Sequence, residues 1–242
     1  MSKLPLAPLL EVIFEVKWPL KTTEDLTKYQ YLHGDFFAKL GNKYPFRELL
    51  IPPEVPMDAY LNIPAHRFRT AKNSYPLIQI GPGILTVNTT DEKYIWENYE
   101  KLCTEAFITL VSQYKFKADE NITLSLKYFD FFLYNFKDNN INKFLSDNFH
   151  IQLKQTFLKE TNNPTSVNLG FFYDTKIGGF SIRMNKGNNF KGQQGIIIDT
   201  TISNNSSIPD ITKVSKWLND AHDYVSETFK AMTKGKMYDS FK

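Results

Sequence analysis

The stretch that decides the fold is Leu77–Leu102, LIQIGPGILTVNTTDEKYIWENYEKL. Two short apolar runs flank the corner Gly81-Pro82-Gly83, and glycine and proline are typical of a tight turn between strands. Asp91 then precedes a run in which apolar residues recur every three or four positions, as on one face of a helix. The stretch therefore predicts two paired strands and a helix that Asp91 caps. The predicted buried stripe of this helix is Ile95, Tyr99, Leu102, Ala106 and Leu110.

Upstream of this stretch the pattern predicts further strands and one long helix. EVIFEVKW, residues 11–18, alternates between two faces and ends before Pro19, which is typical of a strand. A helix is expected to begin after Thr22 or Thr23 and to end at Gly41, because apolar residues recur between them at helical spacing. HRFR, residues 66–69, is expected to be a strand.

Downstream, ITLSLKYFDFFLYNF, residues 122–136, predicts a long strand that is buried on at least one face. A short helix is expected next, at INKFLSDNF. Four further strands and a closing helix capped by Asp210 complete the chain. These strands are predicted at QLKQTFL (152–158), SVNLGFFYD (166–174), GGFSIRMN (178–185) and QGIIIDTTI (194–202).

The predicted fold class is α+β, with antiparallel sheets covered by long amphipathic helices. The polar run Lys137–Asn140 marks the best linker, so we expect an N-terminal half at 1–137 and a C-terminal half at 141–242. WENYEKLCTEAF and WLNDAHDYVSETF share Trp near the start and Glu-x-Phe near the end. The halves are therefore interpreted as copies of one ββ(β)α-containing unit, and two unrelated α+β halves are the alternative.

The charge, cysteine content and apolar runs of the chain disfavour several classes of protein. A formal charge of +3, from 29 Lys+Arg against 26 Asp+Glu, is too small to favour a nucleic-acid partner without a local basic patch. Cys103 is the single cysteine, so no internal disulfide framework exists. The longest charge-free run, 73–90, is broken by prolines and glycines and predicts no membrane span. Glu11 and Glu15 interrupt what would have to be a signal core, and a cytoplasmic protein is expected.

Several segments together carry a family resemblance: PLLEVIFEVKW, RFRT followed by LIQIGPGILTVN, LSLKYFDFF, and LNDAHDYVSETFKAMTKGKMYDSF. With these segments the chain resembles a family of sporadically distributed, uncharacterised bacterial proteins. The resemblance implies a cytoplasmic bacterial protein of patchy occurrence, which fits accessory or defence-associated genes better than core metabolism. It brings no activity, cofactor or catalytic residue. Lys127 stands where the family pattern usually has Arg, and Asp130 where it often has Asn.

The sequence gives little indication of a phosphate-binding loop or a metal site. Glycines 187, 192 and 195 have the spacing of a phosphate loop, but a strand follows them where the motif requires a helix, so a hairpin turn is predicted. The four histidines lie far apart in the sequence, and His33 and His222 fall on apolar helical stripes, which favours histidines hydrogen-bonded in the core. We therefore expect no metal, no cofactor and no assigned catalytic residue.

Asp130 and the arginines of HRFR are the remaining candidates. Asp130 is the only acid inside a strongly apolar strand, where burial would raise its pKa unless a cation such as Arg67, Arg69 or Lys127 compensated its charge. The side chains of Arg67 and Arg69 would project from the same face of the strand, about 7 Å apart, and could bind an anion or an acidic protein surface. Structural salt bridges on a solvated sheet face are the alternative for the arginines. The candidate binding residues are thus Arg67, Arg69, Lys72, Phe68, Tyr75 and Asp130.

Three functions follow from these candidates. The leading hypothesis is a non-catalytic accessory protein of bacteria that binds another protein or itself, for instance in an antiphage-defence or toxin-neutralising system. The second is nucleotide or nucleic-acid binding through a patch formed by Arg67, Arg69 and Lys72 with nearby aromatics. The third is an enzyme with a non-motif active site near Asp130, for which a deep pocket that holds a perturbed acid would be the distinguishing feature.

Overall fold

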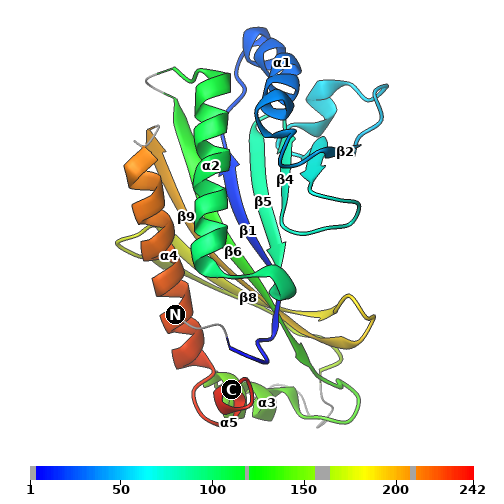
Figure 1. Ribbon diagram of the computed structural model, residues 1–242. Coiled ribbons are helices and arrows are strands. Elements are labelled where there is room, and N and C mark those ends of the chain that lie inside the picture. Colours follow the sequence, from blue (N-terminus) through cyan, green and yellow to red (C-terminus); the bar gives the residue numbers. More distant parts are fainter. Residues whose placement is uncertain (1–3, 118–119, 156–163, 208–210) are drawn as a thin grey trace.

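The computed structural model of the protein describes residues 4–117, 120–155, 164–207 and 211–242 (Figure 1). Within these ranges the chain forms nine strands, five α-helices and two short 3-10 helices. In chain order the elements are β1 (Leu9–Lys17), α1 (Thr23–Leu40), β2 (Phe46–Leu49), η1 (Met57–Tyr60), β3 (His66–Arg69), β4 (Leu77–Gly81), β5 (Ile84–Thr90), η2 (Asp91–Lys93), α2 (Trp96–Tyr114), β6 (Asn121–Leu133), α3 (Ile141–Phe149), β7 (Asn168–Asp174), β8 (Gly179–Asn188), β9 (Gln194–Ser207), α4 (Ile211–Met232) and α5 (Lys236–Asp239).

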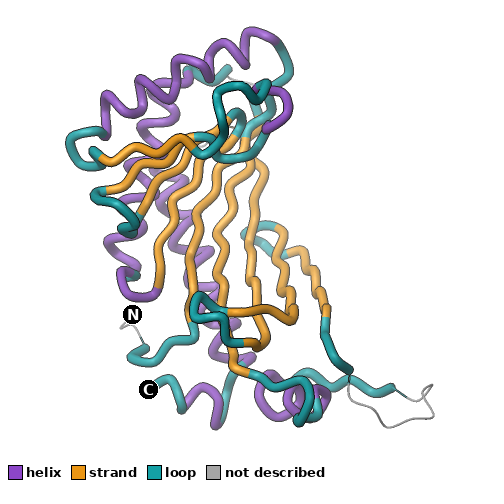
Figure 2. The backbone as a smooth tube through the Cα atoms, turned by 90° about the vertical axis from the view of Figure 1, so that its right-hand side faces the viewer, coloured by secondary structure: helices purple, strands orange, loops and turns teal. Residues whose placement is uncertain are grey.

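In the part of the chain that the structure describes, all nine strands belong to one antiparallel sheet. Their order is β2-β3-β4-β5-β1-β6-β9-β8-β7 (Figures 1 and 2). The central strand β1 pairs with β5 on one side and with β6 on the other, so that Val12 lies opposite both Thr89 and Tyr128. The class is therefore α+β. The sheet also runs through the predicted boundary near residue 137, because β6 pairs along its length with β1 and β9.

The long helices α1, α2 and α4 lie on the same side of the sheet (Figure 1). α1 contacts β4, α2 contacts β5, and α4 contacts β6 and β9. The alternation in β1 explains which face they cover, since Val12, Phe14 and Val16 are fully buried on it. No helix among the described residues is long and apolar enough to cross a membrane.

The opposite face of the sheet carries a row of polar, hydrogen-bonded side chains across β3, β4, β5 and β1. Gln79 joins Arg67 to Asn88 there, and the Asn88 amide donates to Glu11 at 2.9 Å. Further along, Lys127 forms an ion pair of 2.9 Å with Glu15. These contacts satisfy side chains that the strand alternation places away from the apolar core.

Local sequence signals set several element boundaries as predicted. Thr22 caps α1 in a reciprocal capping box with Asp25. Gly83 takes a φ of 80° in the turn that joins β4 to β5, a conformation that glycine adopts without steric cost. The segment around Gly192 forms the hairpin connection between β8 and β9.

Three predicted details need correction or lie outside the described residues. Asp91 does not cap α2, because it begins the 3-10 turn η2, and the helix starts at Trp96, whose buried indole is held by Asn219. Ile95 therefore precedes the helix and is 53% exposed. The strand predicted at 152–158 does not form over 152–155, where the chain is irregular and Leu153 packs against the core. Residues 156–158 and Asp210 lie outside the described residues.

Candidate functional site

The site is built on β6, the long strand beside the centre of the sheet. Its alternation directs Leu124, Leu126, Tyr128, Asp130 and Phe132 to one face, and each of them is buried. That face is the one that α4 covers. Asp130 is therefore held in an apolar row with only 6% of its surface exposed.

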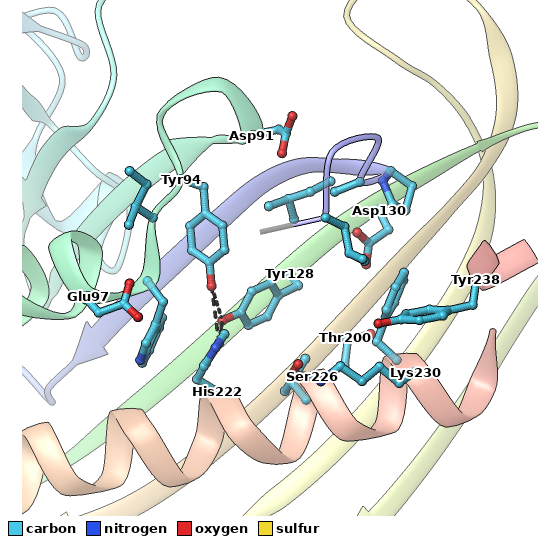
Figure 3. Close-up of a pocket in the computed structure, with 18 residues that line it drawn as sticks. Asp91, Tyr94, Glu97, Tyr128, Asp130, Thr200, His222, Ser226, Lys230 and Tyr238 are labelled. Atoms are coloured by element: carbon cyan, nitrogen blue, oxygen red, sulfur yellow. Dashed lines mark hydrogen bonds between the residues drawn. The ribbon is translucent and has the colours of Figure 1, made fainter. Parts of the chain in front are cut away.

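Asp130 opens into a cavity of about 330 Å³ between β6, α4, the start of α2 and the N-terminal segment 4–9 (Figure 3). We call this cavity the Asp130 pocket. Most of its lining is apolar or aromatic, as is usual for small-molecule sites. Its apolar and aromatic lining residues are Leu4, Ala7, Pro8, Leu9, Tyr94, Ile95, Trp96, Tyr128, Val225, Phe229 and Tyr238. Its other lining residues are Asp91, Glu97, Asp130, Thr200, His222, Ser226 and Lys230.

Three side chains from different elements meet in one wall of the pocket. His222 Nδ1 on α4 hydrogen-bonds with the Tyr128 hydroxyl at 2.8 Å and with the Tyr94 hydroxyl at 3.3 Å, and the two hydroxyls are 3.0 Å apart (Figure 3). The His222 ring also stacks on Trp96, with ring centroids 4.0 Å apart. This arrangement fixes α4 to the sheet and to the start of α2.

The polar groups in this wall are uncharged at neutral pH. Burial lowers the pKa of His222 to about 4, which leaves the imidazole neutral. Burial also raises the pKa of the Tyr94 and Tyr128 hydroxyls, so both stay protonated. These three side chains can therefore form hydrogen bonds in the pocket without adding a charge to it.

Asp130 has a different environment. Burial, and to a smaller degree the negative charge of Asp91, raise the pKa of its carboxyl from 3.8 to about 7. Among the described residues Asp130 has no hydrogen-bond or ion-pair partner for its carboxyl. The cations expected to compensate its charge are engaged elsewhere, because Lys127 pairs with Glu15 and Arg69 with Glu48. Asp130 is thus a buried acid that faces a cavity and titrates near neutral pH.

Other charged residues surround the cavity on three sides. Asp91 comes from η2, Glu97 from the first turn of α2, and Lys230 from the last turns of α4 (Figure 3). Each of these three residues takes part in interactions of its own. Counted with Asp130, the described lining residues include three carboxyl groups and one lysine.

The arginines of β3 lie in another part of the sheet. Three strands separate β3 from β6, and the arginines project from the polar face while Asp130 projects from the helix-covered face. Arg69 Nε donates to Glu48 at 2.8 Å, its side chain is 7% exposed, and Arg67 lies 3.8 Å from the same carboxylate. Two arginines and one glutamate leave a single net positive charge in this cluster.

The residues predicted to accompany the arginines are only partly brought together. The Tyr75 ring lies 5.3 Å from the Arg69 guanidinium, in a cation–π arrangement. Lys72 is exposed on the loop that follows β3. Phe68 is fully buried on the opposite face, beneath Phe36 and Phe37 of α1, and belongs to the core.

The remaining sequence candidates have structural surroundings. His33 stacks on His66 with ring centroids 4.2 Å apart, and burial lowers the pKa of both rings, to about 4 for His66. Among the described residues, His33 Nδ1 is buried without a hydrogen-bond partner. Cys103 is fully buried, which raises the pKa of its thiol. In the ranges that the structure describes, no group of three or more His, Cys, Asp or Glu side chains is arranged to hold a metal ion.

Sequence reasoning identified Asp130 as a site candidate but missed its neighbours. Tyr94 and His222 are 128 positions apart in the sequence, and Trp96, Glu97 and Lys230 read as ordinary residues of amphipathic helices. The single usable signal is His222, a histidine on an apolar stripe. It is hydrogen-bonded as expected, and it also lines the pocket.

Comparison of the chain with protein-family models, with curated proteins and with solved structures gives no match.

Proposed function

We propose that the protein binds a small organic molecule in the Asp130 pocket. The observation that carries the proposal is Asp130 itself, a carboxyl 6% exposed that has no partner among the described residues and faces a cavity of about 330 Å³. Buried polar groups are almost always hydrogen-bonded or paired, and a carboxyl that is not has a cost to folding. A ligand that completes its hydrogen bonding would offset that cost.

The lining supports binding of this kind. Cavities that bind small molecules are typically of about 300–1,000 Å³, mostly apolar, with a few polar groups that fix the orientation of the ligand. Here the aromatic rings of Trp96, Tyr128 and Phe229 provide contact area. The hydroxyls of Thr200 and Ser226 and the carboxyl of Asp130 provide the polar groups.

This proposal keeps the sequence-based hypothesis of a binding protein but moves the site from the arginines to the pocket. Glu48 compensates half of the charge of Arg67 and Arg69, and Arg69 is largely covered. A cluster with one net charge attracts phosphate groups weakly. The accessory role in bacteria that the family resemblance implies would then be the binding of a small molecule.

Acid–base catalysis by Asp130 is the second candidate function. The observation that favours it is the pKa of about 7, since an acid that titrates near the working pH can both accept and donate a proton. If the protein is an enzyme of this kind, Asp130→Asn should lower its turnover by about 100-fold or more while leaving the binding of neutral ligands intact.

The binding proposal is tested with a neutral fluorescent probe, N-phenyl-1-naphthylamine, which brightens in apolar sites. We expect saturable binding to the wild-type protein at one site per chain. Ala7→Phe, which places a ring in the cavity, should weaken this binding at least tenfold. The matched control Ala38→Phe lies on the exposed side of α1 and should leave it unchanged. Equal binding by both folded variants, or no saturable binding at all, would contradict the proposal.

We further propose that the chain consists of two related units. The strand order supports this, because β1-α1-β3-β4-β5-α2 and β6-α3-β7-β8-β9-α4 have the same connectivity. In each unit the third strand of an antiparallel meander returns to pair with the first strand, and β1 pairs with β6 where the units meet. The units so defined divide between α2 and β6 rather than at residue 137. β2 is an addition to the edge of the first unit.

A further inference from the structure

We propose that the Asp130 pocket selects organic cations, with the Asp130 carboxylate as the counter-ion of the bound ligand. This inference rests on the proposed function, and it names the chemical class of the ligand. Its geometric basis is a cavity in which a buried carboxyl lacks a partner among the described residues while aromatic rings surround it.

The carboxyl groups among the described lining residues favour a cation. Asp130 from β6, Asp91 from η2 and Glu97 from α2 line the cavity together (Figure 3). Asp91 and Asp130 are close enough for the charge of one to act on the other. Like charges in a common site disfavour the ionised forms, and a cation bound near them would remove this repulsion. An anionic ligand would increase it.

Among the described residues, no lysine or arginine forms an ion pair with Asp130. Lys127 is three residues away in β6 but projects to the other face of the sheet, where it pairs with Glu15 at 2.9 Å. Lys230 lines the same cavity from α4, yet it forms no ion pair with Asp130, and it has interactions of its own. The position beside the Asp130 carboxyl therefore has no charge partner from the described chain.

The aromatic lining favours a cation over a neutral molecule of the same shape. Trp96, Tyr94, Tyr128, Phe229 and Tyr238 line the cavity. The faces of such rings attract cations that lie within about 6 Å, and the attraction is larger where water is excluded. A planar, delocalised cation would contact these rings and place its positive charge near the carboxyl.

Binding of a cation must be coupled to the release of a proton. At neutral pH part of the Asp130 population is protonated, since its pKa is about 7. When a permanently charged cation binds to this form, the O–H bond of the carboxyl breaks, the proton leaves to the buffer and the carboxylate pairs with the ligand. Among the described residues, the ionisable groups that line the same cavity as Asp130 are Asp91 from η2, Tyr94 from the turn before α2, Glu97 from α2, His222 and Lys230 from α4, Tyr128 from β6 itself and Tyr238 from α5. Within the described part of the N-terminal segment, Leu4, Ala7, Pro8 and Leu9 line the cavity, and none of these four has a charged side chain.

The test uses two probes that differ in charge and by one methyl group. Thioflavin T carries a permanent positive charge on its benzothiazolium ring, and its analogue without the ring N-methyl group is neutral. Dissociation constants for both are measured by fluorescence titration and calorimetry at pH 6, 7 and 8, with wild-type protein and with Asp130→Asn. N-Phenyl-1-naphthylamine binding and thermal unfolding verify that the variant is folded and that its pocket is open.

We expect thioflavin T to bind the wild-type protein at pH 8 at least tenfold more tightly than the neutral analogue. Its affinity should rise about tenfold between pH 6 and pH 8, because the ionised fraction of a group with a pKa of about 7 rises by that factor. The affinity of the neutral analogue should vary by less than twofold. In Asp130→Asn the preference for the cation should fall to about twofold or less, and the pH dependence should disappear.

The outcomes separate this inference from the proposed function. If the neutral analogue binds as tightly as thioflavin T, or if the preference survives in Asp130→Asn, the cation selectivity is wrong although the pocket binds ligands. The pH dependence in the wild-type protein needs no variant, so a variant that fails to fold leaves the test intact. If none of the three probes binds, the proposed function fails together with the inference.

Discussion

At the scale of single residues, Asp130 combines two properties that conflict in a stable protein. Its strand places it in a row with Leu126, Tyr128 and Phe132, where apolar or hydrogen-bonded side chains are favoured. Its carboxyl has no partner among the described residues. The pKa of such a group rises, because an isolated charge in an apolar site is unfavourable. The conflict is therefore resolved by protonation, or by a ligand.

The stability of the protein should depend on pH through Asp130. In the unfolded chain the pKa of its carboxyl is near 3.8, and in the folded protein it is about 7. Between these values the folded state holds a proton that the unfolded state has released, so the wild-type protein loses stability as the pH rises from about 4 to about 7. The amide introduced by Asp130→Asn does not titrate. We expect the free energy of unfolding of Asp130→Asn, relative to wild type, to increase by about 1.4 kcal/mol per pH unit in this range.

Urea unfolding at pH 4.5, 5.5, 6.5 and 7.5 measures this difference. Parallel curves for the two proteins would show that the Asp130 pKa is not raised, and they would weaken its assignment to a buried site.

At the scale of elements, the site depends on how α4 is held against the sheet. The hydroxyls of Tyr94 and Tyr128 meet the His222 ring, and the Trp96 indole donates to Asn219 at 2.8 Å. These bonds join α4 to β6 and to the start of α2, so they position one wall of the pocket. They are buried or half-buried, and removal of one partner would leave buried polar atoms with fewer hydrogen bonds.

His222→Ala should lower the free energy of unfolding by about 1–3 kcal/mol at pH 7.5, because two tyrosine hydroxyls lose their common partner. The cost should decrease as the pH falls. The pKa of His222 is about 4 when folded, against an ordinary value of 6.5, so the stability contributed by the neutral ring is lost between pH 6.5 and pH 4. Denaturant unfolding at pH 7.5 and pH 5 measures both values.

The control for this prediction is Asn219→Ala, which lies on the same helix and leaves the Trp96 indole without its acceptor. It should cost about 1 kcal/mol at both pH values, because no titrating group is removed. If the cost of His222→Ala is equally independent of pH, its ring is not held neutral by burial.

At the scale of the whole molecule, the two proposed units meet along β1 and β6. Leu6, near the start of the described chain, also lies beside Phe241 near its end, since the backbone N–H of Leu6 donates to the carbonyl of Phe241 at 3.0 Å. The connection between α2 and β6 is therefore a natural place to open the chain without loss of any strand pairing. The walls of the pocket come from both units. The pocket would be retained, because this opening leaves the pairing of β1 with β6, which joins the units, intact.

A circular permutant opened between α2 and β6, with a short Gly/Ser linker between Lys242 and Met1, should fold and keep probe binding in the pocket. Its matched control is a permutant opened inside β6 after Tyr128, which interrupts the pairing of β6 with both β1 and β9. Far-UV circular dichroism, cooperative unfolding and N-phenyl-1-naphthylamine binding distinguish the two. If the first permutant fails like the second, the proposed units are not the structural units of the chain.

The sequence by itself determined the elements and the faces of most of them. Alternation in β1 and β6 and helical spacing in α1 and α2 are local patterns, and each buries an apolar face whatever the partner is. The same kind of reasoning singled out Asp130, because a lone acid in an apolar strand is anomalous from its immediate neighbours alone. Sequence reasoning placed the start of α2 wrongly. The helix begins at Trp96, whose indole forms a tertiary hydrogen bond with Asn219.

Only the tertiary structure decided what surrounds Asp130. The pocket joins residues from segment 4–9, η2, α2, β6 and α4, and no sequence spacing links Tyr94 to His222. The pKa of Asp130 depends on solvent exclusion by the packed elements and on its distance from Asp91, both of which are properties of the assembled fold. Likewise, Arg67 and Arg69 share a face as the strand period requires, but Glu48 reaches them only because β2 pairs with β3. Periodicity fixes the direction of a side chain, and packing fixes the side chains it meets.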